Sequence, residues 1–92
     1  NNRGVMAARA GDLEGSVRLL TEAADRVPSV QFLINATKAI CALMDRQGWR
    51  DDLAERARRY LEQAMAKSPG DVRVLSGREV FQRVSGKYGI SS

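Results

Sequence analysis

Histidine is absent from this sequence, and cysteine occurs only once, as Cys41. A single cysteine cannot form an internal disulfide, and a chain without histidine cannot build Cys/His zinc sites or the Cys–His and Ser–His pairs of nucleophilic enzymes. The sequence also has no glycine-rich phosphate loop and no paired acid and base. We therefore predict that the chain is not an enzyme and has no catalytic residue, metal or cofactor.

Aromatic residues are scarce as well, at 5% of the chain, and no apolar run approaches the roughly 20 residues that span a bilayer. The formal net charge is +4 and comes mostly from arginine. A basic excess is compatible with nucleic-acid binding, but so few aromatics leave little for the bases to stack on. We therefore do not expect a membrane as a partner, and we expect a protein rather than a nucleic acid. Weak nucleic-acid binding stays open as an alternative.

Residues 1–15 lack the apolar core of a signal peptide, so we expect the protein to be cytoplasmic. The chain begins without methionine, inside a segment of helical composition, and we therefore expect it to be part of a longer protein. Its 92 residues are enough for one small domain with a thin core.

Helix-forming residues dominate what is present, and β-branched clusters are few. Asp12 and Ser29 can each cap the start of a helix, Pro28 and Gly48 can each end one, and the stretch 68–70 (Ser-Pro-Gly) breaks the chain strongly. The sequence therefore predicts an all-α fold. The expected segments are the end of a helix at 1–9 and helices over about 12–28, 29–47, 50–67 and 71–88.

Apolar spacing predicts which side of each helix is buried. Leu13, Val17, Leu20 and Ala24 recur on one face of the first complete helix. The next helix is apolar around most of its circumference, so we expect neighbours to contact it from two sides. The last helix is expected to bury Leu75, Phe81, Val84 and Tyr88. Two glycines should each weaken that helix by roughly 1 kcal/mol relative to alanine; they are Gly77 and Gly86.

A spacing pattern occurs twice along the chain. The first copy is Ser16, Leu20, Ala23 and Pro28, and the second, with the same spacing, is Ala57, Leu61, Ala64 and Pro69. Upstream of each copy a small residue precedes a turn glycine by seven positions, as Gly4 and Gly11, then Cys41 and Gly48. Small residues at these positions let two antiparallel helices approach closely, and the large one fills the space between them.

These spacings resemble the tetratricopeptide repeat, in which a small residue and a turn glycine precede an Ala…Phe/Leu…Ala…Pro pattern. The resemblance implies one domain over 1–92, built as an array of antiparallel helix pairs. It would contain a first repeat with a truncated first helix, a lengthened second repeat and a closing helix, over 1–28, 29–69 and 70–90.

The second repeat departs from the family's period of about 34 residues, because Pro28 and Pro69 are 41 residues apart. Four of the seven extra residues lie after the turn glycine and three before it. Each insertion is about one helical turn. Both helices of this repeat are therefore expected to be one turn longer and to keep their inward faces.

The family stacks its first helices along a concave groove that takes a partner's peptide. The resemblance implies that the groove here is lined by polar, cationic and small side chains, which are Val5, Arg9, Asn35, Lys38, Ala42, Arg46 and Arg78. Amide and cationic groups can grip a peptide backbone, a carboxylate or a phosphate. The alternative, that Lys38, Arg46 and Arg78 only form solvated helix faces, stays open. The Lys/Asn pair with which chaperone-tail binders hold a terminal carboxylate is replaced by Asn1 and Val5.

Three further features each have two interpretations. Trp49 follows the turn at the lengthened edge and is either a cover for the longer helices or an exposed anchor for a partner. Cys41 occupies a small packing position, which favours a buried inert thiol over a nucleophile. Asp45, Asp51 and Asp52 look like a carboxylate cluster, but acids at a helix N-terminus explain the last two without a metal.

The resemblance implies a non-catalytic protein–protein interaction module that binds a partner peptide or protein in its groove. The Asn-Asn-x-Gly start, the lengthened second unit and the Lys-Tyr-Gly-Ile tail are similar to C-terminal tetratricopeptide regions of bacterial two-component response regulators. This similarity implies a role in bacterial signal transduction. Two alternatives stay open: a homo-oligomerisation module, using the truncated first helix or an exposed Phe81/Trp49 face, and a nucleic-acid-binding helical array.

Overall fold

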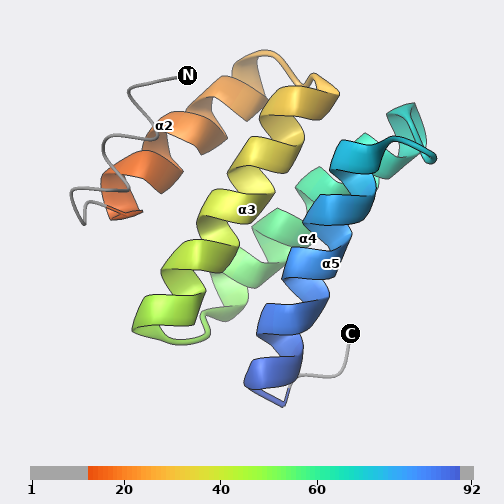
Figure 1. The fold of residues 1–92 in the computed structure, drawn as a ribbon. Helices are drawn as coiled ribbons and strands as arrows, with labels where there is room; N and C mark the ends of the chain where they lie inside the picture. The colour runs from red at the N-terminus through yellow and green to blue at the C-terminus, as the bar shows by residue number, and fades with distance from the viewer. Residues whose placement is uncertain (1–12, 90–92) are drawn as a thin grey trace.

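The computed structural model describes residues 13–89, which form four α-helices and no strand (Figure 1). The helices are α2 (Leu13–Arg26), α3 (Val30–Gln47), α4 (Asp51–Lys67) and α5 (Val72–Lys87). The predicted all-α fold is confirmed, and the predicted helix boundaries agree with the observed ones to within about two residues. The helix expected over 1–9 and the cap expected at Asp12 lie outside the described residues.

Helix α3 lies at the centre of the array and packs against α2, α4 and α5. In Figure 1, α2 and α5 lie on opposite sides of α3, and α4 lies behind α3 and α5. Helix α3 can occupy this central position because it is apolar around most of its circumference, and each of its three neighbours needs an apolar face to pack against. Its buried residues are Leu33, Ile34, Ala36, Thr37, Ile40, Cys41, Leu43 and Met44.

Local capping sets the helix ends. The Ser29 hydroxyl accepts a hydrogen bond from the Phe32 amide at 3.2 Å, as its position before the helix predicts. Gly48 has a φ of 108°, a conformation that other residues rarely adopt, and its amide donates to the Met44 carbonyl at 2.8 Å. At the start of α5, the Asp71 carboxylate accepts from the Arg73 amide at 2.8 Å. The positions of these helix ends can therefore be predicted from the identity of single residues.

The buried face of α5 differs from the predicted one at Leu75, whose prediction as an inward residue is wrong. Leu75 is 51% exposed, whereas its neighbour Val74 is 1% exposed. Successive residues on a helix are rotated by about 100°. The face that meets α3 and α4 therefore follows Val74, Gly77, Phe81 and Val84, which are all buried, and Leu75 points away from it.

Helices α3 and α5 run parallel and side by side (Figure 1). Near their N-terminal ends, Arg73 Nη1 donates to Gln31 Oε1 at 3.1 Å. Near their C-terminal ends, Lys87 Nζ donates to Asp45 Oδ1 at 2.7 Å. In both pairs the α5 residue lies 42 positions after its α3 partner, so one register holds along the whole contact.

Helices α2 and α4 are joined by a polar network around Tyr60. The Tyr60 hydroxyl donates to Asp25 Oδ1 at 2.8 Å, while Arg56 donates to the Tyr60 hydroxyl at 2.9 Å and to Asp25 Oδ2 at 2.7 Å. Burial and the bond to Asp25 raise the pKa of Tyr60, so the phenol stays protonated as a donor. No helix within residues 13–89 is both long enough and apolar enough to cross a membrane.

Candidate functional site

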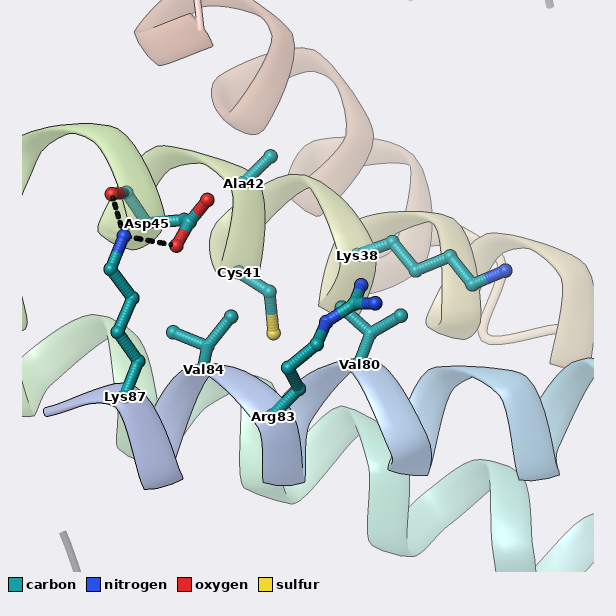
Figure 2. Close-up of a pocket in the computed structure, with 8 residues that line it drawn as sticks. All are labelled: Lys38, Cys41, Ala42, Asp45, Val80, Arg83, Val84 and Lys87. Carbon is teal, nitrogen blue, oxygen red and sulfur yellow. Dashed lines mark hydrogen bonds and ion pairs between the residues drawn. The ribbon is translucent and has the colours of Figure 1, made fainter. Parts of the chain in front are cut away.

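A cleft of about 370 Å³ lies between α3 and α5 (Figure 2). Each helix contributes four residues with the spacing i, i+3, i+4 and i+7, which places them on one helical face. Each α5 residue also lies 42 positions after one of the α3 residues, in the register that the end contacts set. The lining residues are Lys38, Cys41, Ala42 and Asp45 from α3, and Val80, Arg83, Val84 and Lys87 from α5.

The middle of the cleft is apolar and chemically inert. The Val84 side chain and the Cys41 thiol point into the space between the helices (Figure 2), and Ala42 adds a third small residue to the lining. Cys41 is fully buried, as its packing position predicts. Burial raises the pKa of its thiol to about 12, against the opposing charge of Arg83. The thiol is therefore protonated at neutral pH and is a poor nucleophile.

One end of the cleft is closed by an ion pair between Asp45 and Lys87. Lys87 Nζ donates to Asp45 Oδ1 at 2.7 Å and to the Asp45 carbonyl at 3.2 Å. The bond and charge of Lys87 lower the pKa of Asp45, and the bond and charge of Asp45 raise the pKa of Lys87. The Tyr88 hydroxyl donates to the Met44 carbonyl at 2.8 Å. The end of α5 thus supplies donors for carbonyls at the end of α3.

The other end of the cleft carries Lys38 and Arg83. Figure 2 shows the Arg83 side chain reaching from α5 toward α3 beside Cys41, and the Lys38 side chain extending away from the Asp45–Lys87 pair. Neither Lys38 nor Arg83 takes part in the ion pairs found within residues 13–89. The lining therefore holds three cations and one carboxylate, and its uncompensated positive charge lies at this end.

Two of the predicted groove residues, Lys38 and Ala42, line the cleft. Asn35 and Arg46 also lie on α3, but neither lines it. Asn35 is half-buried and accepts a hydrogen bond from Gln31 Nε2 at 3.2 Å, whereas Arg46 is exposed.

Arg78 is exposed on α5 but does not line the cleft, and Arg9 lies outside the described residues. Arg78 lies 36 positions after Ala42, its counterpart in the predicted groove. The observed register is 42, and the six-residue difference corresponds to about one and two-thirds helical turns. Arg78 therefore falls on a different face of α5 from the cleft.

The sequence pattern missed most of the α5 side of the cleft. Apolar spacing predicted that Val84 faces inward, but no motif marks Val80, Arg83 or Lys87, because their role depends on how α5 lies against α3. The signal that could have found them is complementary charge at matching helix positions. Of such pairs, Asp45 with Lys87 would have predicted the register between α3 and α5.

Trp49 is half-buried between the ends of α3 and α5. Its ring centroid lies 6.3 Å from those of Phe81 and Tyr88, and its Nε1 donates to Asp51 Oδ1 at 2.9 Å. This geometry supports the interpretation of Trp49 as a cover. Phe81 is only 5% exposed, so the exposed Phe81/Trp49 face considered for self-association does not exist in this fold.

Replacing Trp49 with alanine is expected to lower the free energy of unfolding by about 1–3 kcal/mol, because its contacts with Phe81 and Tyr88 are lost. Trp49→Phe keeps an aromatic ring there and should recover much of the loss. Urea denaturation followed by circular dichroism measures both. Unchanged stability of Trp49→Ala together with weaker partner binding would instead identify Trp49 as an anchor.

The carboxylates near Trp49 do not gather into one site. Asp45 pairs with Lys87, Asp51 accepts from Trp49, and Asp52 pairs with Arg50 at 2.9 Å. Within residues 13–89 no group of three or more acidic or cysteine side chains is placed to hold a metal ion.

Most of the ion pairs that arginines form on the described surface are local. Within residues 13–89, five arginines pair with a carboxylate, and four of these pairs join residues within one helical turn of each other. The fifth, between Arg56 and Asp25 at 2.7 Å, joins α4 to α2. Arg83 forms no such pair, and the same is true of four other arginines within residues 13–89.

Comparison of the chain with family models, with curated proteins and with solved structures gave no match in any of the three.

Proposed function

We propose that this chain is a non-catalytic protein-interaction module of the tetratricopeptide type, which binds a peptide segment of a partner protein in the cleft between α3 and α5. The observation that carries the proposal is the cleft itself, formed by matching faces of two parallel helices and lined by three cations, one carboxylate and small aliphatic residues. On the resemblance to response regulators, we place the module in bacterial signal transduction, in the cytoplasm.

The side chains in the cleft suit binding better than catalysis. The Cys41 thiol is protonated because its pKa is raised to about 12, and Asp45 is held by Lys87 with a lowered pKa. Neither group is therefore available as a nucleophile or a general base near neutral pH. What remains is a set of aliphatic contacts and hydrogen-bond donors, the groups that recognise a peptide.

The lining also favours a peptide over a nucleic acid. Proteins that bind single strands present aromatic side chains on which bases stack. None of the residues lining this cleft is aromatic. The walls are instead formed by Ala42, Val80 and Val84, which match aliphatic side chains in size and polarity.

The proposal predicts that reversing the two unpaired charges, as in the double variant Lys38→Glu/Arg83→Glu, will lower peptide affinity by about tenfold or more. Losing one charge-assisted hydrogen bond is enough for a change of that size. Peptides selected on the wild-type chain from a random display library are titrated by fluorescence anisotropy against both chains.

The matched control is Arg59→Glu/Lys67→Glu on α4. It makes the same change in charge at two exposed residues that lie outside the cleft. Circular dichroism checks that both double variants remain helical. Equal affinity of the wild type and the Lys38/Arg83 variant would refute binding in this cleft. Equal losses of affinity in both double variants would show that the change in net charge, and not the cleft, causes the loss.

A further inference from the structure

The two ends of the cleft differ in the state of their charges. At one end, the Lys87 ammonium is held by Asp45 at 2.7 Å and by the Asp45 carbonyl at 3.2 Å. At the other end, Lys38 and Arg83 form no ion pair within residues 13–89. Figure 2 shows the separation directly, with the dashed contacts at the Asp45 end and the Arg83 guanidinium toward the Lys38 end.

An anion therefore meets opposite conditions at the two ends. Near Lys38 and Arg83 it finds two cations that form no ion pair within residues 13–89. Near Lys87 it would have to approach the Asp45 carboxylate and the C-terminal end of α3, where the helix dipole is negative. Arg83 also acts on Asp45 through space, since its charge helps to lower the pKa of that carboxyl.

The distance between the ends suits a short stretch of extended peptide. Lys38 and Asp45 are seven residues apart on α3, or about 10 Å along the helix axis. A polyproline II segment rises about 9 Å in three residues and returns to the same side of its axis. Side chains i and i+3 of such a peptide can therefore reach both ends of the cleft, while the residues between them pass Ala42 and Val84.

We infer that the cleft binds an acidic peptide with a fixed polarity, in which a glutamate or aspartate at position i lies between Lys38 and Arg83 and a neutral residue at i+3 lies against the Asp45–Lys87 pair. Asp45 is then the residue that determines specificity, because it prevents Lys87 from binding a second carboxylate. This inference rests on the proposed function, and it adds the chemistry of the partner peptide and its orientation.

The test compares two capped tetrapeptides, acetyl-Glu-Val-Val-Gln-amide and acetyl-Glu-Val-Val-Glu-amide, titrated into the isotope-labelled chain and followed by amide chemical shifts. The wild type is expected to bind the di-acidic peptide no more tightly than the mono-acidic one, since Asp45 keeps Lys87 from binding the second carboxylate. In Asp45→Asn, Lys87 is free to bind, and the di-acidic peptide should bind about fivefold to tenfold more tightly than the mono-acidic one.

The matched control is Asp52→Asn, which removes a carboxylate paired with Arg50 at 2.9 Å and located outside the cleft. It should leave the wild-type preference unchanged. A nitroxide attached at the glutamine end of the mono-acidic peptide should broaden the amides of Asp45 and Lys87 more than those of Lys38 and Arg83. A label at the glutamate end should give the reverse.

The outcomes separate this inference from the proposed function. The peptides could change the amide chemical shifts of the cleft residues while Asp45→Asn shows no new preference for the di-acidic peptide, or while the nitroxide broadens the amides at both ends equally. Either result would overturn the fixed polarity of the peptide and leave the proposed binding function intact. If neither peptide changes the amide chemical shifts of the cleft residues, the inference that the ligand is an acidic peptide is wrong. The display selection would still decide whether another peptide binds. If short mixed-sequence DNA changes the amide chemical shifts of the same residues more strongly than the peptides do, the inference that a peptide occupies the cleft is wrong.

Discussion

Truncation of Ile40 to alanine is expected to lower the free energy of unfolding by about 2–5 kcal/mol. Ile40 is fully buried on α3, the helix that packs against α2, α4 and α5. A cavity there cannot be closed by moving one neighbour, because α3 would lose its contact with another. A domain of this size has a total stability of about 5–15 kcal/mol, so the variant should lose a large share of it.

Urea denaturation followed by circular dichroism measures this loss, and two variants calibrate it. Ile40→Val removes one methyl group and should lower the free energy of unfolding by about 0.5–1.5 kcal/mol. Leu75→Ala removes a side chain of similar size from the surface of α5 and should change it by only about 0.5 kcal/mol. If the alanine variants at Ile40 and Leu75 were equally destabilised, the assignment of the core would be wrong.

Helix positions were predictable here because each depends on a few neighbouring residues. Ser29 and Gly48 mark the ends of α3 through contacts within one helical turn, which sequence shows directly. The apolar circumference of α3 likewise predicted that more than one helix would cover it. Such features do not depend on where distant parts of the chain lie.

The packing register between helices could not be predicted in the same way. It depends on pairs such as Asp45 with Lys87 and Gln31 with Arg73, whose members are 42 residues apart. The resemblance to the tetratricopeptide repeat placed Arg78 in the groove, but it did not define which residues of α3 and α5 lie side by side. Leu75 was assigned to the core for a related reason, since the inward face of α5 is set by its partners.

The candidate site was accordingly predicted only on its α3 side. Lys38 and Ala42 follow from their positions on an expected groove helix, but Arg83 and Lys87 enter the cleft through the register of α5. The charge asymmetry of the cleft is a tertiary property in the same sense. It exists because one of the α5 cations meets an α3 carboxylate and the other does not.

The two glycines of α5 also differ in a way that only packing reveals. A Cβ at Gly77 would lie 3.1 and 3.2 Å from the Cδ1 and Cγ2 of Ile34 and 3.7 Å from Leu61 Cδ1. A Cβ at Gly86 would meet no atom within 4 Å. Both glycines lie within α5 and have the same intrinsic cost to the helix, so their difference is a measure of how closely α5 approaches α3 and α4.

Replacing Gly77 with leucine is therefore expected to lower the free energy of unfolding by about 1–3 kcal/mol, because the new side chain must displace Ile34 from a packed interface. Gly86→Leu has no neighbour to displace and should stabilise the protein by up to about 1 kcal/mol through its better helix propensity. Urea denaturation of the two variants under identical conditions gives the comparison. Effects of the same sign and size would mean that α5 does not pack on α3 through Gly77, and the register that forms the cleft would then have to be abandoned.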